Sequence, residues 1–156
     1  MAVHVIRRTL PAPAARAFEV VHDYERRLAW DTLLSAAWVE PGWERAGLGV
    51  ETVCRGRTSL GRIALKTRYV AFKPGDVAAV VMVNRPTFFE RWAASIRHVD
   101  LGEGRSEVIY TLHFLARPTW LRWMLHPLMG VLFRWETRRR LDALDRYLRA
   151  PARPPV

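Results

Sequence analysis

Three polar side chains stand where the alternation of a strand predicts inward-facing positions. Glu90 lies between Phe88 and Trp92 in one alternating segment, and Tyr69 and Tyr110 hold similar places in two others. A carboxylate facing a cavity can accept a proton, and a phenol can donate a hydrogen bond to a carbonyl. These three residues are therefore the catalytic candidates. The alternatives are a Glu90 at a strand end, in water or paired with an arginine, and tyrosines that are ordinary core aromatics.

The sequence carries none of the common signatures of cofactor or nucleophilic chemistry. It has no glycine-rich dinucleotide fingerprint, no phosphate-binding loop and no Gly-x-Ser-x-Gly elbow. Its five histidines and Cys54 show no metal-ligand spacing. We therefore expect no metal site and no cofactor.

Seven segments have the composition or alternation of strands, and together they would form the sheet that positions these side chains. They cover residues 3–10, 36–40, 48–57, 62–72, 77–84, 88–99 and 106–116. Two short helices are predicted between the first two strands, over residues 14–22 and from Asp23 to Leu34. The turn at residues 73–76 predicts a hairpin that pairs Phe72 with Val77 and Tyr69 with Val80.

The predicted inner faces supply a set of ligand-binding candidates, because a small-molecule pocket is mostly apolar with a few convergent polar groups. Eight come from the strands and two from the helix that follows them. They are Thr52, Thr67, Tyr69, Met82, Glu90, Trp92, Tyr110, Phe114, Leu128 and Leu132.

Residues 118–148 predict one long helix, or two pieces broken near Pro127. A stripe at three-to-four spacing marks the face expected to pack on the sheet. It comprises Leu121, Met124, Leu125, Leu128, Leu132, Trp135, Leu141, Leu144 and Leu148. Trp120 and Trp123 widen the apolar surface beyond one face, which suits a membrane interface, a homodimer contact or cover by loops.

The composition indicates one domain over residues 1–150, followed by a flexible, proline-rich tail over residues 151–156. A lone cysteine and the lack of an N-terminal targeting pattern favour a soluble, cytoplasmic protein. The net charge is +10, nearly all of it from arginine. Such a charge suits nucleic acid or anionic membrane, or it is simply a solvated arginine surface.

The order of strand, two short helices, six strands and long helix resembles the SRPBCC (START/Bet v1-like) superfamily. Residues 8–18, 23–31 and 138–148 are similar to its polyketide cyclase/dehydrase and lipid-transport branch. The resemblance implies an α+β helix-grip fold of order β-α-α-β6-α, in which a curved seven-stranded antiparallel sheet wraps on the long C-terminal helix. It also implies an apolar cavity between the sheet and that helix.

Three functions remain open from the sequence. The first is binding of a hydrophobic small molecule, such as a polyketide, lipid or isoprenoid, in that cavity. The second is an enzyme of the same fold, a cofactor-free cyclase or dehydratase. The third is a basic regulatory module that binds RNA, the ribosome or an anionic membrane.

Overall fold

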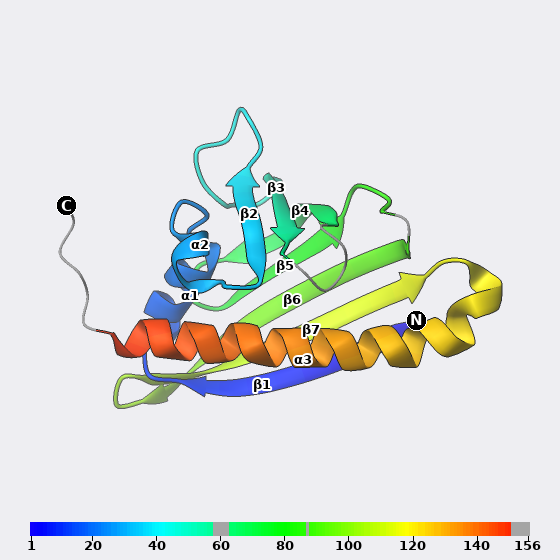
Figure 1. The fold of residues 1–156 in the computed structure, drawn as a ribbon. Helices are drawn as coiled ribbons and strands as arrows, with labels where there is room; N and C mark the ends of the chain where they lie inside the picture. Colours follow the sequence, from blue (N-terminus) through cyan, green and yellow to red (C-terminus); the bar gives the residue numbers. More distant parts are fainter. Residues whose placement is uncertain (58–62, 87, 151–156) are drawn as a thin grey trace.

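The elements follow the predicted order across residues 1–57, 63–86 and 88–150, which the computed structural model describes (Figure 1). The strands are β1 (Ala2–Leu10), β2 (Leu34–Val39), β3 (Glu51–Gly56), β4 (Ala64–Lys73), β5 (Val77–Met82), β6 (Phe89–Gly102) and β7 (Arg105–Ala116). The helices are α1 (Ala14–His22), α2 (Arg27–Trp30), a 3-10 turn (Thr119–Leu121) and α3 (Arg122–Arg149). The second helix is shorter than predicted, because Leu34 already belongs to a strand. The predicted tail lies outside the described residues.

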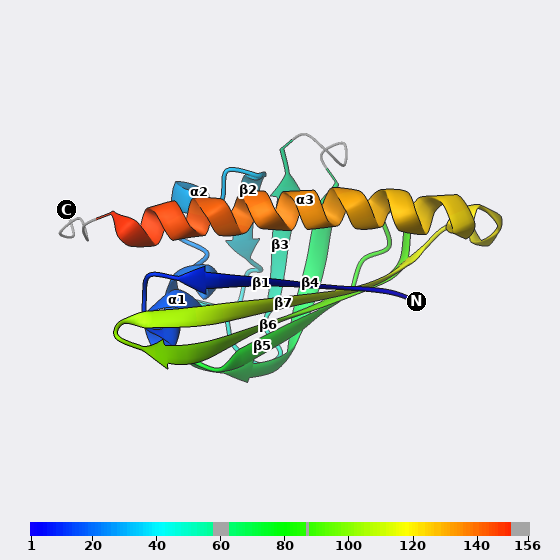
Figure 2. The same cartoon turned by 90° about the horizontal axis from the view of Figure 1, so that it is seen from below.

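The strands form one antiparallel sheet in the order β1-β7-β6-β5-β4-β3-β2. The sheet curves, and α3 runs along its length on one side, as two views at right angles show (Figures 1 and 2). The short helices α1 and α2 lie towards the C-terminal end of α3 (Figure 1). This is the helix-grip α+β fold that the sequence predicts. No helix in the described part of the chain is long and apolar enough to span a bilayer.

The β4–β5 hairpin has the predicted register at one end and a shifted register at the other. Tyr69 pairs with Val80 as predicted, but Phe72 pairs with Ala78 instead of Val77. A bulge between Tyr69 and Ala71 inserts the extra residue that causes the shift. Alternation alone contains no signal for such an insertion.

A second bulge, between Phe89 and Arg91, changes which residues of β6 face inward. Phe89 is buried, whereas Phe88 is 47% exposed. Phe88 and Glu90 therefore do not share the inner face with Trp92, and the prediction is wrong for both residues. Beyond it, the inward alternation from Trp92 onward is as predicted.

Helix α3 is one continuous helix that passes through Pro127. Its buried face is offset from the predicted stripe, because two apolar stripes lie on opposite sides of the same helix. The residues packed inward include Met129, Phe133, Leu141, Leu144 and Leu148. Of the predicted stripe, the last three leucines are buried, but Met124, Leu128 and Trp135 are exposed.

At Gly130, α3 makes a close approach to the first strand. A Cβ at this position would lie 2.6 Å from Cε1 and Nε2 of His4. The His4 ring stacks on Phe114, with ring centroids 5.7 Å apart, so it has little room to retreat. The glycine therefore sets the distance between α3 and the sheet.

We expect Gly130→Ala to destabilise the protein by about 1–2 kcal/mol, because overpacking a tight contact outweighs the helix propensity that alanine adds. Urea unfolding followed by circular dichroism measures the change. Gly56→Ala is the matched control, since a Cβ there meets no atom of the described residues within 4 Å. Equal or higher stability of Gly130→Ala would show that His4 yields without cost.

Candidate ligand-binding site

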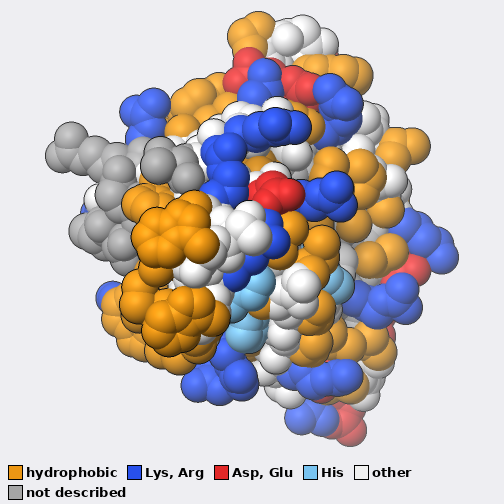
Figure 3. All heavy atoms as spheres, turned by 90° about the vertical axis from the view of Figure 1, so that its right-hand side faces the viewer, with side chains coloured by type: hydrophobic (Ala, Val, Ile, Leu, Met, Phe, Trp, Pro, Cys, Tyr) orange, Lys and Arg blue, Asp and Glu red, His pale blue; other side chains and the backbone are white. Residues whose placement is uncertain are grey.

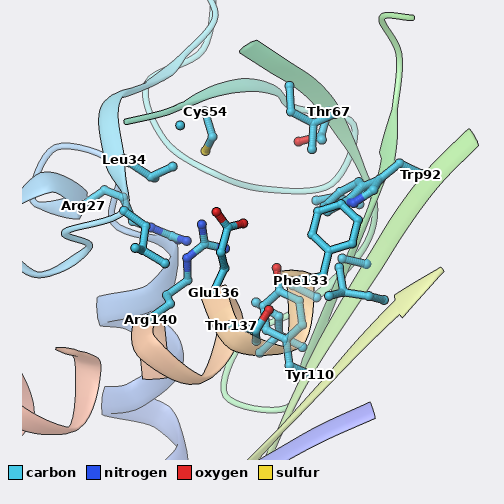
Figure 4. Close-up of a pocket in the computed structure, with 18 of the residues that line it drawn as sticks. Arg27, Leu34, Cys54, Thr67, Trp92, Tyr110, Phe133, Glu136, Thr137 and Arg140 are labelled. Atoms are coloured by element: carbon cyan, nitrogen blue, oxygen red, sulfur yellow. The ribbon is translucent and has the colours of Figure 1, made fainter. Parts of the chain in front are cut away.

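A cavity of about 160 Å³ lies between the curved sheet and α3 (Figure 4). Strands β3 to β7 form its floor, α2 and the segment after it close one end, and α3 covers it. Most of the wall is apolar, and the side chains that contribute this surface include Leu34, Ile63, Leu65, Val80, Phe89, Trp92, Ile96, Leu112 and Phe133. The fold thus forms a small, largely apolar cavity between the sheet and α3.

Four of the predicted ligand-binding residues line this cavity: Thr67, Tyr69, Trp92 and Tyr110. Thr52 and Phe114 are fully buried behind its wall. Met82 packs on the main core from a neighbouring position on β5. A ligand-binding role for these residues stays a prediction.

The remaining predicted residues lie elsewhere. Glu90 is on the surface, where its carboxylate pairs with Arg122 and its side chain is 43% exposed. The bulge that begins at Phe89 turns Glu90 away from the cavity, so the alternative of an inward carboxylate is wrong and the alternative of a carboxylate paired with an arginine is confirmed. Leu128 faces solvent and Leu132 is half-buried, because the inner stripe of α3 passes through Phe133 instead.

Charged side chains that the sequence analysis did not select form one end of the cavity. Arg27 from α2 and Glu136 and Arg140 from α3 point towards one another there (Figure 4). Arg27 donates a hydrogen bond to Asp31 Oδ2 at 3.0 Å. Arg140 Nε lies 3.0 Å from the same oxygen, and the Asp31 side chain is completely buried. The i,i+4 spacing of Arg27 with Asp31 and of Glu136 with Arg140 was the signal available in the sequence.

For both Asp31 and Glu136, burial raises the pKa of the carboxyl group and neighbouring arginines lower it. Burial alone would raise the pKa of Asp31, but Arg140 and Arg27 outweigh it and the pKa is lowered. Burial raises the pKa of Glu136, although Arg140 and Arg139 oppose the rise. Asp31 is therefore a fixed counter-ion, whereas Glu136 exchanges its proton closer to neutral pH than an exposed glutamate does.

A chain of hydrogen bonds continues from the cavity wall towards α1. His22 Nδ1 lies 2.7 Å from the Tyr69 hydroxyl, which lies 3.3 Å from the hydroxyl of Tyr24. Tyr24 donates to Thr52 Oγ1 at 3.1 Å, and Thr52 is hydrogen-bonded to Thr67. Burial raises the pKa of Tyr24 to about 12 and lowers the pKa of His22 well below its usual value. These groups are neutral at pH 7 and supply hydrogen bonds rather than charge.

We expect Asp31→Asn to lower the free energy of unfolding by about 3 kcal/mol, because removing one partner of a buried ion pair leaves the other charge uncompensated. Chemical denaturation at pH 7 measures the loss. Asp76→Asn is the control, because its partner Lys73 is largely exposed. Near-equal losses in the two variants would contradict a structural role for the Asp31 ion pairs.

The loss of stability in Asp31→Asn should also depend on pH. The pKa of Asp31 is lower in the folded state than in the unfolded state. Its contribution to the free energy of unfolding is therefore complete above the unfolded-state pKa of about 4, and it is lost as the pH falls through the folded-state pKa. The stability difference between wild type and Asp31→Asn should therefore stay constant from neutral pH down to about pH 5 and shrink at lower pH.

Comparisons with known proteins agree with this architecture. A START superfamily protein from Mycobacterium smegmatis superposes with a TM-score of 0.77 at 13% identity, covering 94% of this chain and 96% of that one. A protein from Thermus thermophilus gives 0.78 at 15% identity, with 94% and 97% covered. The ZhuI aromatase/cyclase from a Streptomyces species gives 0.75 at 15% identity, with 94% of each chain covered. At these identities the likeness shows the fold alone.

Family membership rests on the sequence itself. No curated protein matches the chain significantly. The family described as polyketide cyclase/dehydrase and lipid transport matches residues 1–149, which is nearly the whole sequence. The chain therefore belongs to the polyketide cyclase/dehydrase and lipid transport family.

Proposed function

We propose that the cavity binds a compact apolar ring system that carries a carbonyl, phenol or carboxylate oxygen. The observation that carries this proposal is the pair of arginines, Arg27 and Arg140, at one end of a cavity whose remaining wall is mostly apolar. Family membership supports a hydrophobic ligand.

The arginine end suits an oxygen with negative charge or a strong dipole. Both guanidinium groups contact Asp31, so one fixed carboxylate serves two cations. Burial raises the pKa of Glu136, so this carboxyl group offsets the two guanidinium groups less readily than an exposed glutamate would. Because charge-assisted hydrogen bonds are shorter and stronger than neutral ones, a ligand oxygen would be oriented towards the arginines.

The size of the cavity favours rings over a long acyl chain. Its volume of about 160 Å³ is close to the roughly 150 Å³ that holds benzene in an engineered protein cavity. Phe133 and Trp92 line the cavity (Figure 4), as does Leu112, and they offer flat and branched surfaces that pack on a ring. One or two fused rings match this space better than a lipid tail does.

The test compares 1-naphthol with naphthalene, which differ by one oxygen. We expect Arg140→Met to weaken 1-naphthol binding by about tenfold, the cost of one hydrogen bond to a charged group, and to leave naphthalene affinity unchanged. Isothermal titration calorimetry measures both affinities. Arg139→Met is the matched control, because Arg139 is the next residue and lies over the Trp135 ring, away from the cavity.

The ratio of the two affinities separates a specific effect from a general loss of structure. A partly unfolded Arg140→Met protein would lose both ligands together, and its melting temperature would reveal the damage. An unchanged ratio in a folded variant would contradict the proposal that Arg140 orients the ligand oxygen.

A second candidate function is cyclisation of a poly-β-ketone, and the position of Glu136 favours it. Burial raises the pKa of the Glu136 carboxyl group, which makes its carboxylate a stronger base than that of an exposed glutamate. Glu136 would remove a proton from a methylene between two carbonyls, and the arginines would stabilise the enolate oxygen. Attack of the enolate carbon on a distant ketone, followed by loss of water, closes and aromatises a ring. Solved aromatase/cyclases share the fold.

If this reaction occurs, we expect Glu136→Gln to lower turnover of a trioxo N-acetylcysteamine thioester by at least about a hundredfold, the typical contribution of a general base. Affinity for 1-naphthol should change little, because the side-chain volume is kept. Glu90→Gln is the control, since that carboxylate lies outside the cavity. Turnover that is absent in wild type, or unaffected by Glu136→Gln, would leave ligand binding as the function.

A further inference from the structure

The outward side of the first half of α3 is apolar and exposed to an extent that the fold and the cavity do not explain. We call it the outer face of α3. It comprises Trp123 (78% exposed), Met124 (42%), Leu128 (62%), Val131 (70%) and Trp135 (49%) of α3, together with Trp120 (75%) of the 3-10 turn that precedes the helix. Figure 3 views this end of the molecule and shows hydrophobic side chains gathered in a protruding cluster, with basic side chains at its margin.

The outer face is separate from the ligand-binding cavity. Met124, Leu128, Val131 and Trp135 follow one another at intervals of four, three and four residues, which places them on one side of the helix. Phe133 lines the cavity from the opposite side of the same helix. The helix is thus apolar on two sides, and one of them faces solvent.

The charged residues of the sequence stretch that carries the outer face are all positive. Residues 117–135 contain no aspartate or glutamate but three arginines, and Arg138 and Arg139 follow in the next turn. The guanidinium group of Arg139 lies over the Trp135 ring, 4.7 Å from its centroid. Arg122 is paired with Glu90, so it is partly neutralised. The apolar surface is therefore flanked mainly by positive charge.

Exposed apolar side chains flanked by arginines favour some partners over others. In a symmetric dimer the same patch would meet itself, bringing the arginines of one copy against those of the other. An anionic lipid surface has the opposite charge, and tryptophan side chains favour the boundary between lipid headgroups and acyl chains. A basic helix with an aromatic apolar face typically lies in the plane of that boundary.

We propose that the outer face of α3 docks on an anionic lipid surface. Trp120 and Trp123 enter the headgroup region, while Arg134, Arg138 and Arg139 contact lipid phosphates. The helix lies parallel to the surface, with the cavity on its other side. Docking of this kind does not depend on what the cavity holds, so it stands or falls independently of the proposed ligand.

The test is vesicle flotation of the full-length protein with phosphatidylcholine alone and with phosphatidylcholine mixed with phosphatidylglycerol. We expect wild type to float with the anionic vesicles and to be released as salt is raised, since screening weakens the contribution of the arginines. The double variant Trp120→Ala/Trp123→Ala should bind about tenfold more weakly or worse, because it loses most of the interfacial aromatic area. Both tryptophans are highly exposed, so the variant should keep the fold and the melting temperature.

Trp43→Ala is the matched control, because Trp43 is 49% exposed and lies between β2 and β3, far from α3 in the sequence. It should bind vesicles as wild type does. Equal vesicle binding by the double variant and wild type would overturn the proposal, as would equal binding of wild type to neutral and anionic vesicles. Sedimentation equilibrium gives a further decisive outcome. A wild-type dimer that dissociates in the double variant would assign the outer face to a second copy of the chain.

Discussion

The buried contact of Asp31 with Arg27 and Arg140 is the interaction on which the arrangement of the site depends. It joins the segment after α2 to the middle of α3, two parts of the chain more than 100 residues apart. Hydrophobic packing positions α3 along the sheet, but it does not select one rotation of a helix that is apolar on two sides. The charged contact favours the observed rotation, because that rotation turns Arg140 inward to Asp31. Phe133, Glu136 and Thr137 then face the cavity as a consequence.

Two further contacts hold α3 at the depth that leaves a cavity. Gly130 lets the helix approach His4 and Phe114, which fixes its distance from β1 and β7. Towards the C-terminal end, Arg8 pairs with Asp142 and Asp145 and ties the helix to the same strand. The helix is therefore anchored over β1, while the sheet curves away from it towards β3 and β4. The space left between them is the cavity, so its volume follows from backbone geometry as much as from the size of its lining side chains.

The sequence predicts the architecture well because strand alternation and element order are local patterns with strong physical causes. It predicts the inward tyrosines and Trp92 for the same reason. It fails where one inserted residue decides the outcome: the bulge at Phe89 turns Glu90 outward, and no feature of the segment marks that bulge. It also fails on α3, because period alone cannot tell the stripe through Leu128 from the one through Phe133. The arginines of the cavity were missed because charged residues in helices are normally solvated, and only three-dimensional proximity brings Arg27 and Arg140 to one carboxylate.

The most direct test of this account is an NMR titration of the protein, labelled at its methyl groups and arginine side chains, with 1-naphthol. Nuclear Overhauser effects report which protons lie close to the bound ring. We predict contacts from the ring to the methyl groups of Ile96 and Leu112, together with a shift of the Arg140 Nε–H resonance. Contacts instead to the methyl groups of Leu128 or Val131, with the Arg140 signal unmoved, would place the ligand on the outer face of α3 and contradict the central claim.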